Sequence, residues 1–177
     1  NDSLMYKRLR DDLGLVYSAG FYQTFKWQAG LLMGYIGCKG DKTAEAIRET
    51  LSVMSRLRED VPEDEVRRKR LDALNSFVFN VDSKVDLSTV YARYALRGEP
   101  LNTLDLIQDA FFSAQQSDLQ RIAAERLKPA RIQITVVGDK ELKINQDDGS
   151  VQTLESALKT LAADFGVSYK ELPLRER

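Results

Sequence analysis

Two residues with chemically useful side chains flank a sharp corner near the start of the chain. In the stretch RDDLGLVY, Arg10 lies near the end of a helix-like run, Gly14 interrupts that run, and Tyr17 lies in the extended apolar run that follows. A guanidinium can hold a backbone carbonyl, and a phenol can donate a hydrogen bond to an oxygen that gains negative charge. The two groups could therefore act on one peptide. The alternative is structural: a surface arginine at a helix C-terminus, followed by a half-buried strand tyrosine.

The composition excludes several kinds of site. The 177 residues include no histidine and one cysteine, Cys38, so the chain alone cannot form a Ser-His-Asp site, a Cys-His site, an H-E-x-x-H zinc site or an internal disulfide. Any chemistry must use Asp, Glu, Lys, Arg, Tyr or Ser, or belong to a partner domain. We therefore expect no metal and no cofactor on this chain.

The charge balance also limits the classes of partner. Basic and acidic residues number 26 and 27, so the chain has no net field that would attract nucleic acid or an anionic membrane. No apolar run approaches the ~18 residues of a membrane span. We expect neither a nucleic-acid partner nor a membrane segment. The compartment stays open, because one cysteine suits both cytoplasm and periplasm.

Hydrophobic periodicity predicts the elements that position the corner. The polar residues 1–3 can cap a helix that runs to Leu13, and Gly14 fits the left-handed residue that ends a helix. Two strand-like runs follow, at residues 15–24 and 30–37. Antiparallel pairing of these neighbouring strands is the simplest arrangement.

The rest of the chain is mostly helical by the same criterion. Apolar residues recur at helical spacing in five segments, at residues 40–60, 62–81, 83–96, 101–114 and 117–127, the last with a capping-box start at Ser117 and Gln120.

The C-terminal part mixes both patterns. The run RIQITVVG, residues 131–138, alternates and is β-branched, and it predicts the clearest strand of the chain. A small hairpin around Asp148-Gly149, a helix over 153–167 and a short strand over 168–172 are also predicted. Strands and helices come in blocks, which favours an α+β fold: a mostly antiparallel sheet with helices packed on one face.

Three stretches of this sequence resemble one known family. They are LMYKRLRDDLGLVYSAG (4–20), VPEDEVRRKRLDALNSFVFNVDS (61–83) and the run from YARYALRGEP to ITVVGD (91–139). Their order and spacing are similar to those of the M16 metallopeptidases, the family of pitrilysin, insulinase and the mitochondrial processing peptidase. The resemblance spans about Leu4 to Asp139, and the tail from Lys140 fits it poorly.

The resemblance implies a fold and a role. M16 peptidases are built from similar α+β halves, of the LuxS/MPP-like metallopeptidase fold, that close over a peptide. One half binds zinc through H-x-x-E-H, and the zinc-free half offers an arginine and a tyrosine to the substrate. Arg10 and Tyr17 have the spacing of that pair. Residues 1–139 would then be the C-terminal-type, inactive domain, lacking its opening strand and helix, and 140–177 an extension of it.

The function implied is that of the substrate-binding, zinc-free half of an M16-type zinc metallopeptidase. Arg10 and Tyr17 would bind the peptide substrate, and a companion half, on the same chain or a second subunit, would supply zinc. No activity is expected from this chain alone. The alternative is a non-catalytic M16-like scaffold or protein-interaction subunit, because a fold does not fix a function.

Other candidate residues have stronger structural interpretations. Arg8 competes with Arg10, but its spacing to Tyr17 fits the family less well. The run RRKR, residues 67–70, follows three acidic residues on a predicted helix, which favours a solvated face over a nucleic-acid patch. Cys38 follows apolar residues and is expected to be a quiet, buried or half-buried thiol. Asp147 and Asp148 lack the remaining ligand spacing of a calcium loop and are expected to form a turn.

Overall fold

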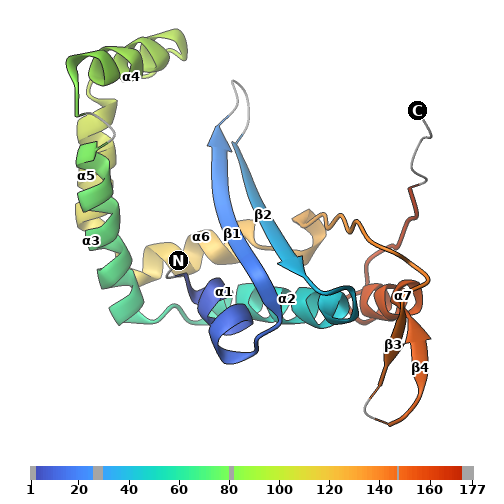
Figure 1. Ribbon diagram of the computed structural model, residues 1–177. Helices are drawn as coiled ribbons and strands as arrows, with labels where there is room; N and C mark the ends of the chain where they lie inside the picture. Colours follow the sequence, from blue (N-terminus) through green and yellow to red (C-terminus); the bar gives the residue numbers. More distant parts are fainter. Residues whose placement is uncertain (1–2, 26–29, 80–81, 147, 173–177) are drawn as a thin grey trace. The chain divides into compact units, whose positions relative to one another are not determined.

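The computed structural model describes residues 3–25, 30–79, 82–146 and 148–172. It divides into two compact units, residues 1–55 with 127–177 and residues 56–126, which we describe separately. The labelled elements are drawn in Figure 1.

The chain begins with a short helix that widens before the corner. α1 (Leu4–Tyr6) is capped by Ser3, whose hydroxyl accepts the N–H of Tyr6, and it continues as the π-helical turn η1 (Lys7–Asp12). Gly14 has a φ of +61° and ends the helix, as predicted. The N–H of Leu15 then donates to the carbonyl of Leu9 at 2.8 Å, which closes the wide turn. Predicted caps at residues 1 and 2 lie outside the described residues.

Replacing Gly14 by alanine is expected to destabilise the protein by about 1 kcal/mol, because an L-residue is strained in the left-handed region. Urea unfolding measures the change. Gly138→Ala is the matched control, since an added Cβ there would lie 3.7 Å from Leu154 in ordinary contact, without a positive φ. Equal losses in the two variants would contradict the assigned role of the left-handed corner.

The corner leads into a long antiparallel hairpin, here called the ribbon: β1 (Val16–Phe25) and β2 (Gly30–Cys38). Both predicted strands and their antiparallel pairing are confirmed. The register runs from Val16 opposite Cys38 to Phe25 opposite Gly30, with a shift between Val16 and Ser18. Tyr17 lies at this irregularity. The part of the ribbon between residues 25 and 30 lies outside the described residues.

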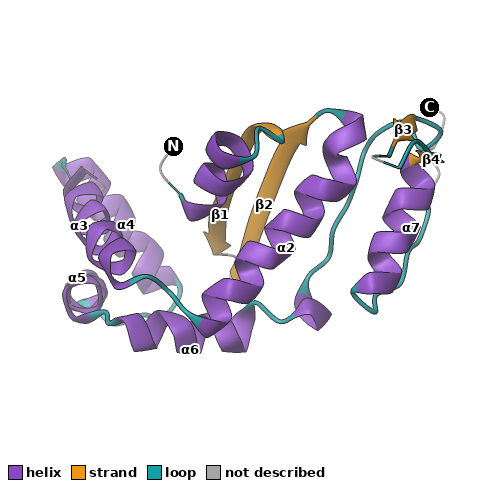
Figure 2. Cartoon of the chain, turned by 90° about the horizontal axis from the view of Figure 1, so that it is seen from below, coloured by secondary structure: helices purple, strands orange, loops and turns teal. Residues whose placement is uncertain are grey.

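The ribbon lies next to the helix that follows it only where β1 begins and β2 ends. Figure 1 shows the start of β1 and the end of β2 next to α2 (Thr43–Glu59), with the rest of the ribbon projecting away, and Figure 2 shows the same helix from below. The buried residues of α2 recur every three or four positions and form one face, comprising Ala46, Ile47, Thr50 and Val53. Met5, Leu9, Val16 and Ala19 are also buried, so this core fixes the corner onto the unit.

The C-terminal segment forms a small layer near the start of α2. β3 (Lys143–Asn145) pairs with β4 (Val151–Thr153) in the predicted hairpin, and α7 (Leu154–Asp164) follows with Thr153 as its N-cap. Ile144, Leu154 and Ala157 make a buried cluster, against which Ala44, Leu142 and Leu158 pack.

Ion pairs reinforce this layer. Lys140 bonds Glu171 at 2.8 Å, and this hydrogen bond raises the pKa of the Lys140 ammonium. The ammonium of Lys159 donates a hydrogen bond to the carboxylate of Glu155 at 2.6 Å. This hydrogen bond lowers the pKa of Glu155 and raises that of Lys159. The contribution of Glu155 to stability is therefore present at neutral pH and is lost as the pH falls through its lowered pKa.

Helices are the only regular elements among the described residues of the second unit. Its helices are α3 (Glu63–Phe79), α4 (Lys84–Leu96), α5 (Thr103–Ser113) and α6 (Gln116–Arg126). Phe77 and Phe111 meet edge to face, with centroids 6.3 Å apart, and join α3 to α5. α6 begins one residue before the predicted Ser117. The N–H of Gln115 donates to the carboxylate of Asp118 at 3.1 Å, so the cap is formed by these residues and not by Ser117 with Gln120.

Two predicted strands are wrong. Residues 132–138 follow a 3₁₀ turn (Pro129–Arg131) and form no strand, although the sequence alternates. Residues 168–172 likewise form no strand. Both runs lack a neighbouring strand within the described residues, and a strand forms only when its N–H and C=O groups find such a neighbour. Ile134 and Val137 are accordingly 48% and 88% exposed.

The fold class is nevertheless confirmed. In the part of the chain that the structure describes, helices and two antiparallel two-stranded sheets follow one another in blocks, which makes the chain α+β. The domain boundary at residue 139 stays a prediction.

Candidate site at the helix–strand corner

Arg10 reaches across the corner to the first residue of β1. Its Nη1 donates a 2.8 Å hydrogen bond to the carbonyl of Val16, while the side chain itself is exposed. The π-helical turn η1 places this arginine, and turns of this kind are frequent at functional sites. One nitrogen of the guanidinium is thus occupied by a hydrogen bond within the protein. Its other N–H groups are the ones that a ligand carbonyl could reach.

Tyr17 follows the anchored carbonyl directly and points to solvent. The residues on either side of the pair Tyr17–Ser18 are buried, with Val16 2% and Ala19 1% exposed, whereas Tyr17 is 59% exposed. Strict alternation would bury positions 17 and 19 or 16 and 18 together. The shift in register between Val16 and Ser18 explains why Tyr17 and Ser18 are both exposed, because an extra residue in one strand lets two successive side chains face the same side.

The corner therefore presents a cation and a phenol that are linked through one peptide group. Arg10 bonds the carbonyl of Val16, and that carbonyl belongs to the peptide bond to Tyr17. Both side chains can donate hydrogen bonds to an incoming oxygen. Their joint action on a peptide stays a prediction.

Arg8, the competing arginine, is engaged elsewhere. Its Nε donates to Glu49 of α2 at 3.0 Å, and its Nη1 lies 3.9 Å from Asp12. The pair with Glu49 connects the N-terminal helix to α2, and the pair with Asp12 lies within η1. The structure thus gives Arg8 a role in holding the unit together, and leaves Arg10 at the exposed corner.

The basic run on α3 is largely engaged within its own unit. Arg68 pairs with Glu65, Lys69 pairs with Asp72 at 3.2 Å, and Arg70 donates to the carbonyls of Phe112 and Ala114 at 3.5 and 3.4 Å. These contacts agree with the predicted solvated face.

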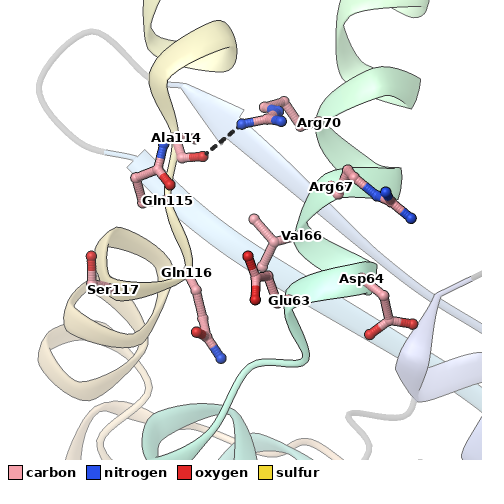
Figure 3. Close-up of a pocket in the computed structure, with 9 residues that line it drawn as sticks. All are labelled: Glu63, Asp64, Val66, Arg67, Arg70, Ala114, Gln115, Gln116 and Ser117. Atoms are coloured by element: carbon pink, nitrogen blue, oxygen red, sulfur yellow. Dashed lines mark hydrogen bonds between the residues drawn. The ribbon is translucent and has the colours of Figure 1, made fainter.

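A polar pocket of about 600 Å³ lies beside this run. Figure 3 shows Arg70 directed at Ala114 across the pocket, with Glu63 and Gln116 below. The full lining comprises Glu63, Asp64, Val66, Arg67, Arg70, Ala114, Gln115, Gln116 and Ser117. The lining contains two acidic and two basic side chains, so the pocket has no net charge that would favour an ionic ligand.

Two further observations concern metals and membranes. Across the residues that the structure describes, His, Cys, Asp and Glu nowhere gather in a group of three or more that could hold a metal ion. Cys38 is half-buried, with its Sγ 3.6 Å from the hydroxyl of Thr43, as expected of a quiet thiol. Within the same described part of the chain, every helix is too short or too polar to cross a bilayer.

The sequence predicts Arg10 and Tyr17 as candidate residues, and this stays a prediction, but it does not predict how the fold displays them. The sequence carries one relevant signal, the pair Val16 and Ala19, which are two small apolar residues three positions apart in β1. That spacing departs from the period of two and indicates an extra residue in the strand.

Comparison with known proteins identifies the part of the chain that carries this corner. Residues 1–71 match the family model described as the peptidase M16 inactive domain. The match includes α1, the ribbon, α2 and the first part of α3, and therefore both Arg10 and Tyr17. No curated protein matches the chain.

Proposed function

Because its first 71 residues match the model of the peptidase M16 inactive domain, we propose that this chain is the substrate-binding, zinc-free half of an M16-type zinc metallopeptidase. A companion half, on the same chain or on a second subunit, would bind the zinc. The sequence contains no histidine, so the chain itself does not fit an H-x-x-E-H metal site.

The zinc of the companion would activate the water that attacks the peptide bond. Arg10 would hold a backbone carbonyl of the peptide through the N–H groups that Val16 leaves free, and so fix the position of the peptide. Tyr17 would donate its phenol hydrogen to the scissile carbonyl oxygen as negative charge develops there. The observation that carries the proposal is the exposed Tyr17 next to a carbonyl anchored by Arg10, within the segment of family similarity.

Replacing Arg10 by alanine in the complete peptidase is expected to lower kcat/KM about 10-fold, mainly through KM, because a charge-assisted hydrogen bond to the substrate is lost. Hydrolysis of a fluorogenic peptide measures both constants. Arg8→Ala is the matched control: it removes an arginine two positions away whose partners are Glu49 and Asp12. Its kcat/KM should stay at the wild-type value.

Equal losses in the two variants would mean that Arg10 acts only through the fold. The alternative function has its own signature. A natural, complete complex that retains no zinc and hydrolyses no peptide would support a non-catalytic scaffold.

A further inference from the structure

The ribbon has an unusual composition for an exposed element. None of the ten residues of β1 or the nine residues of β2 is charged, although charged residues make up 30% of the chain. Exposed strand pairs usually carry Lys or Glu, which discourage association. The two strands therefore lack the charged side chains that usually keep an exposed strand pair from associating.

One face of the ribbon is aromatic and exposed, and we call it the tyrosine face. Residues directly opposite each other share a face, so Tyr22 lies beside Met33, and Tyr35 lies opposite Gly20. These three large side chains are 46%, 40% and 54% exposed. Ser18 belongs to the same face by alternation, and the irregularity at Tyr17 directs the phenol to that side as well.

The side chains of the tyrosine face lie along the strands. A Cβ added to Gly20 would be 2.8 Å from Tyr35 Cε1, so the Tyr35 ring covers the bare backbone at Gly20. The hydroxyl of Tyr22 lies 3.5 Å from the sulfur of Met33. The Tyr35 ring and the Tyr22–Met33 pair thus lie on one face of the ribbon, and the exposed Tyr17 stands on the strand β1 that carries Tyr22.

We propose that the tyrosine face selects the peptide by contacting uncharged, aromatic or aliphatic side chains on one side of the bond to be cut. This inference rests on the proposed function, and it adds the substrate class. Two observations together favour a peptide with uncharged side chains on this face. The face begins at the Arg10–Tyr17 corner, and it offers no counter-ion to a charged residue. A lysine or glutamate of the peptide placed there would lose water without gaining a partner.

The test uses the complete, natural peptidase and a set of fluorogenic peptides in which a single phenylalanine or lysine is moved along one uncharged sequence. Wild type is expected to prefer phenylalanine over lysine about 10-fold in kcat/KM at one position, as one aromatic contact would provide. Tyr35→Glu should abolish or reverse that preference. Met33→Glu, on the same face, provides a second variant should the first fold poorly.

Gln23→Glu is the matched control, because Gln23 is exposed on β1 but pairs with Leu32 on the opposite face. It should keep the wild-type preference. Unchanged selectivity in both tyrosine-face variants would overturn the inference alone. Dissociation of the complex by these variants would also overturn it, since the face would then be a subunit interface. A wild-type complex without hydrolysis would instead refute the proposed function.

Discussion

Replacing Tyr17 by phenylalanine is expected to lower kcat/KM of the complete peptidase about 100-fold, with the loss mostly in kcat. The reason is that a phenol directed at the scissile carbonyl is most useful once that oxygen carries negative charge, and removing one such donor costs 10²–10³ in rate in well-studied cases. The variant keeps the aromatic ring and loses one oxygen. Steady-state hydrolysis of a fluorogenic peptide separates the two constants.

Two measurements distinguish this role from a structural one. Because Tyr17 is 59% exposed, the unfolding midpoint of the Tyr17→Phe variant should match that of the wild type. Tyr169→Phe is the control at another tyrosine: the ring of Tyr169, which lies 5.5 Å from Lys159 Nζ, is retained in the variant. If Tyr17→Phe kept the wild-type kcat/KM, the assigned role of its hydroxyl would be wrong.

Truncating Leu9 to alanine is expected to destabilise the protein by about 3 kcal/mol, the usual cost of a cavity at a fully buried leucine. Leu9 is 0% exposed, and its carbonyl receives the N–H of Leu15 at 2.8 Å. It lies between Arg8 and Arg10, so loss of its packing also loosens the turn that directs Arg10. Urea unfolding of the full-length protein gives the free-energy difference.

Leu96→Ala is the matched control, because it makes the same change in another helix at a residue that is 69% exposed. Its effect should stay within about 0.5 kcal/mol. A small effect at Leu9, comparable to that at Leu96, would contradict the assignment of Leu9 to the core that fixes the corner.

Features that depend on neighbouring residues in the sequence could be predicted. The sequence predicts a helix from Ser83, and the hydroxyl of this residue accepts the N–H of Asp86 at 3.0 Å at the start of α4. The left-handed Gly14, the hairpin of β1 and β2 and the stripe of α7 follow from equally local patterns. For the same reason the sequence located the corner and the two polar residues that flank it.

Features that depend on distant partners could not be predicted. The alternation of residues 131–138 records a tendency to pair, but a strand also needs a neighbour, and none lies beside that run within the described residues. The irregularity at Tyr17 is a property of how two strands align, so β1 alone carries only the faint spacing of Val16 and Ala19. The partner of Arg8, Glu49, likewise lies 41 residues away on α2, so the sequence near the corner does not show that Arg8 is engaged there.

The bond from Leu15 to Leu9 has an evolutionary consequence, because it closes a loop of fixed length. Inserting or deleting one residue after Gly14 would advance the following strand by one step, and the phenol would turn inward while a core side chain turned outward. The number of residues that separate the arginine from the tyrosine therefore matters to the display of the two side chains as much as the identity of Gly14 and Leu9 does.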